Sequence, residues 1–144
     1  MKLTIELVPS TSWFSNLRSL LSAAEWDKIR KGCYKHADYK CEICGGVGPA
    51  HPVECHETWE YDEKTSIQKL IGLVSLCPSC HEVKHIGLAG VKGRHAEAVA
   101  HFCKVNGCSA PEAEKYIQEA FAIWNKRSEQ EWDLDIGLLE ELKK

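Results

Sequence analysis

The chain has 144 residues, a formal net charge of −3 at pH 7 and a hydrophobic fraction of 44%. This size predicts one globular domain with terminal elements wrapped around it. No apolar run approaches the roughly 18 residues that a membrane-spanning helix requires, and residues 1–8 lack the apolar core of a secretory signal. We therefore expect a protein of the reducing cytoplasm with no membrane partner, in which eight cysteines indicate metal binding rather than disulfides.

The N-terminal segment, residues 1–37, predicts a short strand and a helix. Residues 3–7 alternate apolar and polar side chains, which is typical of a strand. Ser22 and Glu25 have the spacing of a capping box, and an apolar stripe that includes Trp26 follows them. We expect the helix to start at this box and to lead the chain toward the first pair of cysteines.

The central segment, residues 38–90, predicts a hairpin followed by a helix. Residues 52–61 and 67–76 resemble two strands separated by a polar turn. Pro78 suits the first turn of a helix that we expect to end near residue 88. The order of elements in this core is therefore strand, strand, helix, with cysteines at its borders.

The C-terminal segment, residues 91–144, predicts a helical extension. We expect one helix over residues 94–105 and a second that starts at the Ser109 capping box and ends near residue 127. Residues 132–136 alternate again and predict a strand that pairs with residues 3–7. The whole chain is thus expected to form a single α+β domain with short terminal strands.

The strongest chemical signal is a set of four cysteines in two C-x-x-C pairs. Cys41 and Cys44 precede the predicted hairpin, and Cys77 and Cys80 follow it. Four thiolates can hold one tetrahedral zinc ion without another ligand. We expect a structural zinc site that clamps the two ends of the hairpin and helix, because zinc binding supplies folding free energy. A redox dithiol pair is the alternative, but no thioredoxin-like βαβ pattern surrounds either motif.

A second set of metal-binding residue types lies beside these cysteines. His81 and His85 are spaced i, i+4 on the predicted helix, so that their imidazoles project from one face and can chelate a metal. Strand alternation places Cys55 and Glu57 on one face of the first hairpin strand and His56 on the other. A metal ion with an open position beside a neutral histidine can hydrolyse a phosphodiester, because the metal stabilises charge and the histidine takes a proton from water.

Basic residues flank both sets of motifs. Lys84, Lys92 and Arg94 follow the last cysteine, and a further basic cluster precedes the first one. This distribution indicates phosphate binding near the metal sites, with these three residues as phosphate contacts. The alternative is an ordinary solvated surface of mixed sign.

The segment from Cys41 to His85 resembles the HNH endonuclease family, whose ββα-metal core holds one divalent ion. Its C-x-x-C pairs match those of the zinc-containing members, and Cys55 with His56 occupies the place of the family's Asp-His or His-His dipeptide. The resemblance implies a DNA endonuclease with His56 as general base and with Cys55 and His81 as metal ligands. The His-x-x-x-His spacing is similar to that of colicin-type nucleases, which implies His85 as a further ligand.

The sequence departs from the family pattern at two positions. Gly72 stands where the family has an Asn that orients the base, so that Gln68, Thr65 or backbone groups would have to replace it. The catalytic metal is expected to be one divalent ion, magnesium, manganese, nickel or zinc, and the soft thiolate of Cys55 favours zinc, nickel or another borderline metal over magnesium. Glu54 and Glu57 are the alternative ligands near the same position.

Two other functions remain open from the sequence. The chain could be a non-catalytic zinc module that binds nucleic acid or protein, with Gly72 marking a decayed active site. Alternatively, Cys55, His81 and His85 could complete a second structural zinc site. As a nuclease it is expected to have DNA as its partner and to act as a homodimer or within a larger nucleic-acid-processing complex.

Overall fold

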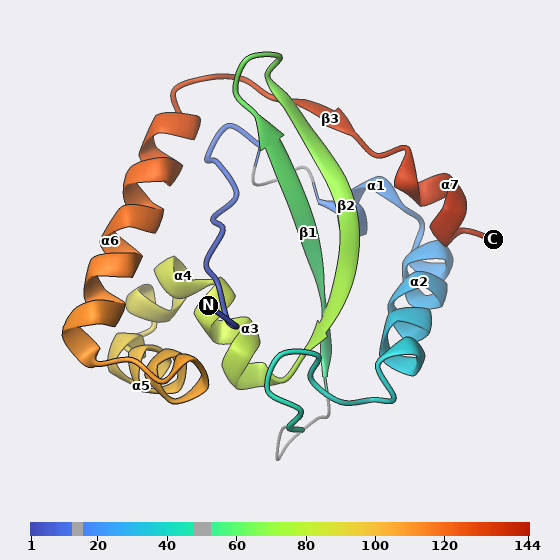
Figure 1. The fold of residues 1–144 in the computed structure, drawn as a ribbon. Helices are drawn as coiled ribbons and strands as arrows, with labels where there is room; N and C mark the ends of the chain where they lie inside the picture. Colours follow the sequence, from blue (N-terminus) through green and yellow to red (C-terminus); the bar gives the residue numbers. More distant parts are fainter. Residues whose placement is uncertain (13–15, 48–52) are drawn as a thin grey trace.

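The computed structural model describes residues 1–12, 16–47 and 53–144, which form an α+β fold with a small sheet and several helices (Figure 1). The strands are β1 (Glu54–Asp62), β2 (Ile67–Leu76) and β3 (Asp133–Asp135). The helices are α1 (Leu17–Leu20), α2 (Ala23–His36), α3 (Pro78–Lys84), α4 (Ile86–Val91), α5 (His95–Asn106), α6 (Ala110–Arg127) and α7 (Leu138–Leu142). None of these described helices has the length and apolar character that crossing a membrane requires. The expected start of the first hairpin strand at residue 52 lies outside the described residues.

The sheet has the order β1-β2-β3, and β1 pairs with β2 in the antiparallel direction. This confirms the predicted hairpin. Cys55 faces Ser75 and His56 faces Val74 across the ladder, and a bulge interrupts the register between Thr58 and Trp59. β3 pairs with the first residues of β2 in the parallel direction.

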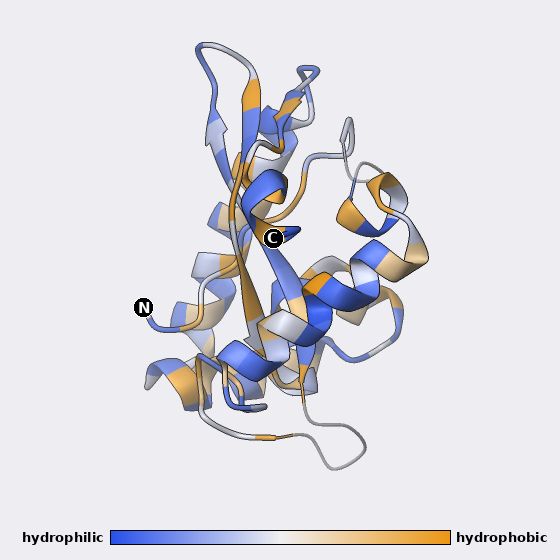
Figure 2. Ribbon diagram, turned by 90° about the vertical axis from the view of Figure 1, so that its right-hand side faces the viewer, coloured by the Kyte–Doolittle hydropathy of each residue, from blue (hydrophilic) through white to orange (hydrophobic). Residues whose placement is uncertain are grey.

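Two groups of helices flank the hairpin (Figure 1). On one side α3, α4, α5 and α6 lie together, and on the other side α1, α2 and α7 lie together. Each group has its own core of buried apolar residues, one around Val83 and Phe102 and the other around Leu17 and Leu70. Figure 2 shows hydrophobic and hydrophilic residues alternating along the helices, as expected of helices that bury one face.

The structure of the N-terminal segment differs from the prediction that residues 3–7 form a strand. Residues 3–7 are extended but form no strand, and β3 pairs with β2 rather than with them. The amide of Leu3 donates a hydrogen bond to Oδ1 of Asn106 (2.9 Å), and that of Ile5 donates to the hydroxyl of Tyr116 (3.3 Å). Both apolar side chains are buried. The alternation therefore reflects packing against α5 and α6, whose side chains take the place of a neighbouring strand.

Among the helices, α2, α5 and α6 agree with the sequence, whereas α1 and α7 were not predicted and one expected helix is divided. The capping boxes of Ser22 and Ser109 start α2 and α6, and α5 ends at Gly107, which has a positive φ of 65°. The single helix expected between Pro78 and residue 88 is divided into α3 and α4. His85 makes this break, because its φ of −108° and ψ of 49° are not helical.

Candidate metal centres

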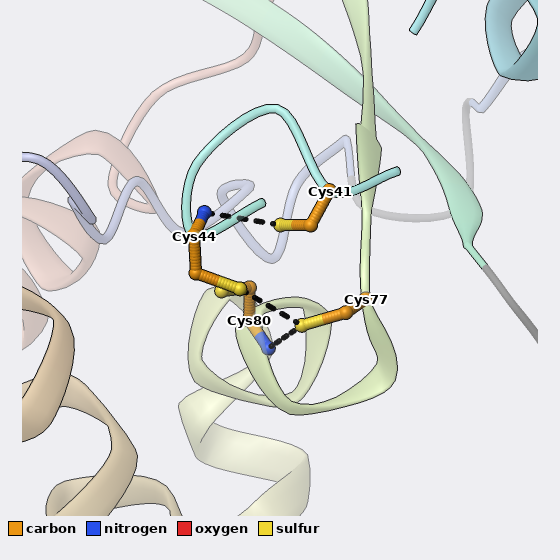
Figure 3. Close-up of side chains that lie close together, drawn as sticks. All are labelled: Cys41, Cys44, Cys77 and Cys80. Atoms are coloured by element: carbon orange, nitrogen blue, oxygen red, sulfur yellow. Dashed lines mark hydrogen bonds between the residues drawn. The ribbon is translucent and has the colours of Figure 1, made fainter. Parts of the chain in front are cut away.

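The first candidate metal centre is formed by the four predicted cysteines, whose side chains converge from two segments (Figure 3). Cys41 and Cys44 belong to the loop after α2, Cys77 caps α3 and Cys80 lies within α3. The four sulfur atoms lie within 4.8 Å of one another, and those of Cys44 and Cys77 are 3.6 Å apart. A tetrahedral zinc with Zn–S bonds of about 2.3 Å places its sulfurs roughly 3.8 Å apart. The four thiols are therefore close enough to hold a metal such as zinc.

Local backbone structure prepares these thiols for metal binding. The amide of Cys44 donates to Sγ of Cys41 (3.5 Å), and the amide of Cys80 donates to Sγ of Cys77 (3.4 Å). Gly45 has a φ of 76°, which permits the tight turn after Cys44. Burial alone would raise the pKa of Cys41, but backbone hydrogen bonds from Cys44 and Cys77 outweigh it and lower this pKa to about 7.

His101 is a neighbour of this cluster that no pattern in the sequence revealed. Its Nε2 atom lies 3.1 Å from Sγ of Cys80. The two residues are 21 positions apart on α5 and α3, and no motif links them. The contact joins α5 to the cysteine cluster and suits an imidazole N–H that donates to a metal-bound thiolate.

The second candidate centre is a cluster of three histidines. His56 comes from β1, His81 from α3, and His85 from the break that follows α3. One ring nitrogen from each lies within 4.8 Å of the others, and the Nε2 atoms of His81 and His85 are 3.1 Å apart. Two imidazoles that bind one ion at about 2.0–2.1 Å hold their nitrogens at such a separation. The ring of His56 is centred 5.3 Å from each of the other two. The three residues can therefore hold a metal, with His81 and His85 as the closer pair.

Glu54 supports this cluster from behind. Its carboxylate contacts Nδ1 of His81, and this contact leaves Nε2 of the same ring directed at His85. A carboxylate on the far nitrogen fixes the tautomer and orientation of a metal-binding imidazole. The residue that the sequence offered as an alternative ligand is thus placed to orient a ligand.

Cys55 corrects the ligand set that the family resemblance implied. Its thiol lies beside that of Cys33 on α2, and this neighbour and burial raise the pKa of Cys55. Glu57, on the same face of β1, accepts a hydrogen bond from the amide of Leu17 (2.7 Å). The structure therefore brings His56, and not Cys55, to His81 and His85. The reason is the alternation of side chains along β1, which points neighbouring residues to opposite faces.

The electrostatic setting keeps His56 neutral. Burial lowers the pKa of its imidazole to about 3, and the charges of His81, His85 and Lys84 act in the same direction. Partial desolvation of the ring at the groove edge and the charge of His81 also lower the pKa of His85, although the residue as a whole is exposed. At neutral pH both imidazoles therefore keep a lone pair that can bind a metal or accept a proton.

The three predicted phosphate contacts have different surroundings. Lys84 is only 8% exposed, and its ammonium group lies 3.0 Å from a carboxylate oxygen of Glu6. Arg94 is paired with Glu82 at 2.6 Å. Lys92 is exposed and lines a small pocket beside His81 and His85. The burial of Lys84 and its ion pair with the half-exposed Glu6 indicate a structural role, and its contact with a phosphate stays a prediction.

The residues proposed to replace the family's Asn lie elsewhere in the hairpin. Gly72 pairs with Thr58, next to the bulge. Gln68 is fully buried near the other end of β2, where its Oε1 accepts a hydrogen bond from Ser12 (2.7 Å). Thr65 lies in the hairpin turn. The structure therefore does not bring Gln68 or Thr65 to His56.

A groove opens beside the histidine cluster. It has a volume of about 1000 Å³, and residues of β1 and of the helices on both sides of the hairpin line it. His56, His81 and His85 line it, and Glu54 lies next to them. The cluster is therefore accessible to a substrate of considerable size. No known protein-family model, curated protein or solved structure matches this chain.

Proposed function

We propose that this protein is a metal-dependent endonuclease that hydrolyses phosphodiester bonds in DNA, with a ββα-metal core of the HNH type. The observation that carries the proposal is the convergence of three imidazoles, from β1, from α3 and from the break after α3, in an open groove. A hairpin strand and the helix after it supply the site, in the order that the family resemblance implies. Enclosed histidines without access to a groove would favour a second structural site instead.

In this proposal His81 and His85 hold one divalent ion, and Glu54 orients the ring of His81. When bound, the ion supplies positive charge that stabilises the reacting phosphate and the leaving oxygen. Imidazole ligands without a thiolate favour zinc or nickel, with manganese next and magnesium last. His56 is the more distant member of the cluster and is neutral at pH 7, so it accepts the proton of the attacking water.

A plasmid-nicking assay with magnesium, manganese, nickel and zinc in parallel tests the proposal. We expect nicking by the wild-type protein and a loss of roughly 10²–10⁴-fold in rate for His56→Ala, which is the usual contribution of a general base. His36→Ala is the matched control, because His36 is an exposed histidine outside both clusters. The control should cleave like the wild type.

Metal content, measured on the same preparations, separates the roles of the histidines. His56→Ala should keep the second metal ion, and His81→Ala should lose it. If His56→Ala also loses this ion, His56 is a third ligand and not the base. Equal nicking by His56→Ala and wild type would overturn the assignment. Absence of nicking with every metal, from protein that still holds zinc, would favour the non-catalytic zinc module.

A further inference from the structure

We infer that the groove beside the histidines binds an unpaired strand of DNA, whose bases stack on aromatic side chains of its walls. This inference rests on the proposed endonuclease function and specifies its substrate. Three features of the groove carry it: its charge, its aromatic lining and its size.

The groove has few basic side chains that could bind the phosphates of a polyanion. Among the described residues its lining contains the basic side chains Arg18, Arg30 and Lys84, and the carboxylates Glu6, Asp27, Glu54 and Glu57. Two of the three cations are already paired, Arg30 with Asp27 at 2.8 Å and Lys84 with Glu6 at 3.0 Å. Proteins that hold duplex DNA through its backbone commonly neutralise about 6–10 phosphates. The groove cannot supply that number of contacts.

Aromatic side chains are abundant on both sides of the groove. The residues are Trp26 and Tyr34 of α2, Trp59 of β1, and Phe121 and Trp124 of α6. All five are partly exposed. The indole of Trp124 is fixed in place, because its Nε1 donates a hydrogen bond to the carbonyl of Val8 (2.9 Å). Aromatic faces at such positions can stack on bases, which are exposed in an unpaired strand and covered by their neighbours in a duplex.

The histidines line the same groove as these two sets of aromatic residues. α2 approaches the groove from one half of the molecule and α6 from the other, with β1 between them (Figure 1). A volume of about 1000 Å³ is at the upper end of the range of small-molecule pockets, which is roughly 300–1,000 Å³. It therefore suits a few nucleotides of one strand. Bases stacked on each side would leave the phosphodiester between them next to His56.

Binding experiments with His56→Ala protein, loaded with zinc, test this inference without cleavage. A labelled single-stranded oligonucleotide and the same sequence as a duplex are titrated at several salt concentrations, with fluorescence anisotropy as the readout. We expect at least about tenfold tighter binding of the single strand, since one stacked base contributes that much. The logarithm of the affinity should fall with that of the salt concentration with a slope no steeper than about −2, because the groove offers at most three basic side chains to phosphates.

Aromatic substitutions identify the stacking surface. Tyr34→Leu and Phe121→Leu, each in the His56→Ala background, should weaken single-strand binding about tenfold and leave the weak duplex binding unchanged. Tyr39→Leu is the matched control, because Tyr39 is 52% exposed and lies outside the groove. Thermal melting and zinc content verify that each variant is folded.

The possible outcomes separate this inference from the proposed function. Equal or tighter binding of the duplex, or an equal loss in Tyr39→Leu, would overturn the inference. Cleavage of duplex DNA faster than single-stranded DNA by the wild type would overturn it also, while the endonuclease proposal would stand. Single-strand binding that depends on Tyr34 and Phe121, without cleavage by the wild type in any metal, would support the binding groove and overturn the endonuclease.

Discussion

The cysteine cluster and the histidine cluster share one helix but differ in their exposure. Cys41, Cys77 and Cys80 are 3%, 5% and 0% exposed, and Cys44 is the one exposed member of the cysteine cluster. His56 and His81 are half-buried, and His85 is exposed at the edge of a groove. Cys80 and His81 are neighbours in sequence, yet α3 directs one to a closed centre and the other to an open one.

This difference shows how the two clusters can be assigned different roles. A closed tetrahedral set of thiolates has no position for a substrate and contributes to folding, whereas a catalytic metal keeps at least one position open. If the assignment is correct, changes in the first cluster should act on stability and changes in the second on metal binding and turnover alone. Substitutions at Cys80, His101 and His81 test that division, and one at Lys84 tests the structural role of its ion pair.

The largest expected effect on stability comes from Cys80→Ser. Loss of a ligand should release zinc, whose binding contributes about 10–16 kcal/mol to the folding of small zinc peptides, more than most domains have to lose. We expect the cooperative unfolding transition to disappear in circular dichroism. Cys108→Ser, which removes a cysteine outside the cluster, should keep a transition close to that of the wild type. If Cys80→Ser still unfolds cooperatively, the folding free energy comes mainly from contacts other than the zinc site.

The next largest effect is expected for Lys84→Met. This change removes a buried ammonium group that is hydrogen-bonded to Glu6 and Thr4, and charged hydrogen bonds of this kind contribute about 1.5–3 kcal/mol each. We expect a loss of about 2 kcal/mol in chemical denaturation, because the carboxylate of Glu6 is half-exposed and recovers solvation. Lys92→Met is the control and should change stability by less than about 0.5 kcal/mol. Equal stability of the two variants would show that the ion pair of Lys84 does not stabilise the fold. That result would favour the predicted phosphate contact of Lys84.

A smaller effect is expected for His101→Ala. The imidazole contacts Cys80, and loss of such an outer partner commonly weakens metal binding by about 10–100-fold. Zinc transfer to a chromogenic chelator should therefore be faster by that factor, while the protein stays folded at saturating zinc. His101→Gln keeps an N–H donor and should recover part of the loss. Unchanged zinc transfer in both variants would show that the contact is only a packing contact.

The smallest effect on stability is expected for His81→Ala. The residue lies at the groove, so its removal should change the free energy of unfolding by less than about 0.5 kcal/mol while abolishing the second metal site. Metal analysis and denaturation of the same sample measure both quantities. If this variant unfolds, or if the wild type unfolds when the second metal is removed, the histidine cluster is a second structural centre. The two clusters would then not differ in role.

Local signals in the sequence predicted most of the secondary structure. The capping boxes of Ser22 and Ser109 predicted the starts of α2 and α6, because each depends only on residues within one helical turn. Turn residues and alternation predicted the hairpin for the same reason. Residues 3–7 have the same local alternation, but their partners are Asn106 and Tyr116, about a hundred positions away. Such distant partners leave no trace in the local pattern, and neither does the parallel pairing of β3.

The candidate site was predictable in its residue types and less so in its geometry. The two C-x-x-C pairs identified the cysteine cluster, since two pairs of thiols with this spacing have few other uses than metal binding. Alternation along β1 correctly placed Cys55 opposite His56, whereas the family resemblance made Cys55 a ligand. Which face meets α3 depends on how the helix is held against the hairpin. Tertiary packing, and not spacing, therefore decides which of the two adjacent residues joins His81 and His85.

Most residues of α3 have a structural or chemical role, and this limits the substitutions that the helix can accept during evolution. Cys80 belongs to one cluster and His81 to the other, Val83 is fully buried in the core, and Lys84 holds Glu6. Ser79 is the exposed residue of this seven-residue helix. Neutral substitutions should therefore collect at Ser79, and the rest of the helix should change only together with its distant partners. A segment this constrained is the part of the chain by which remote relatives would be recognised.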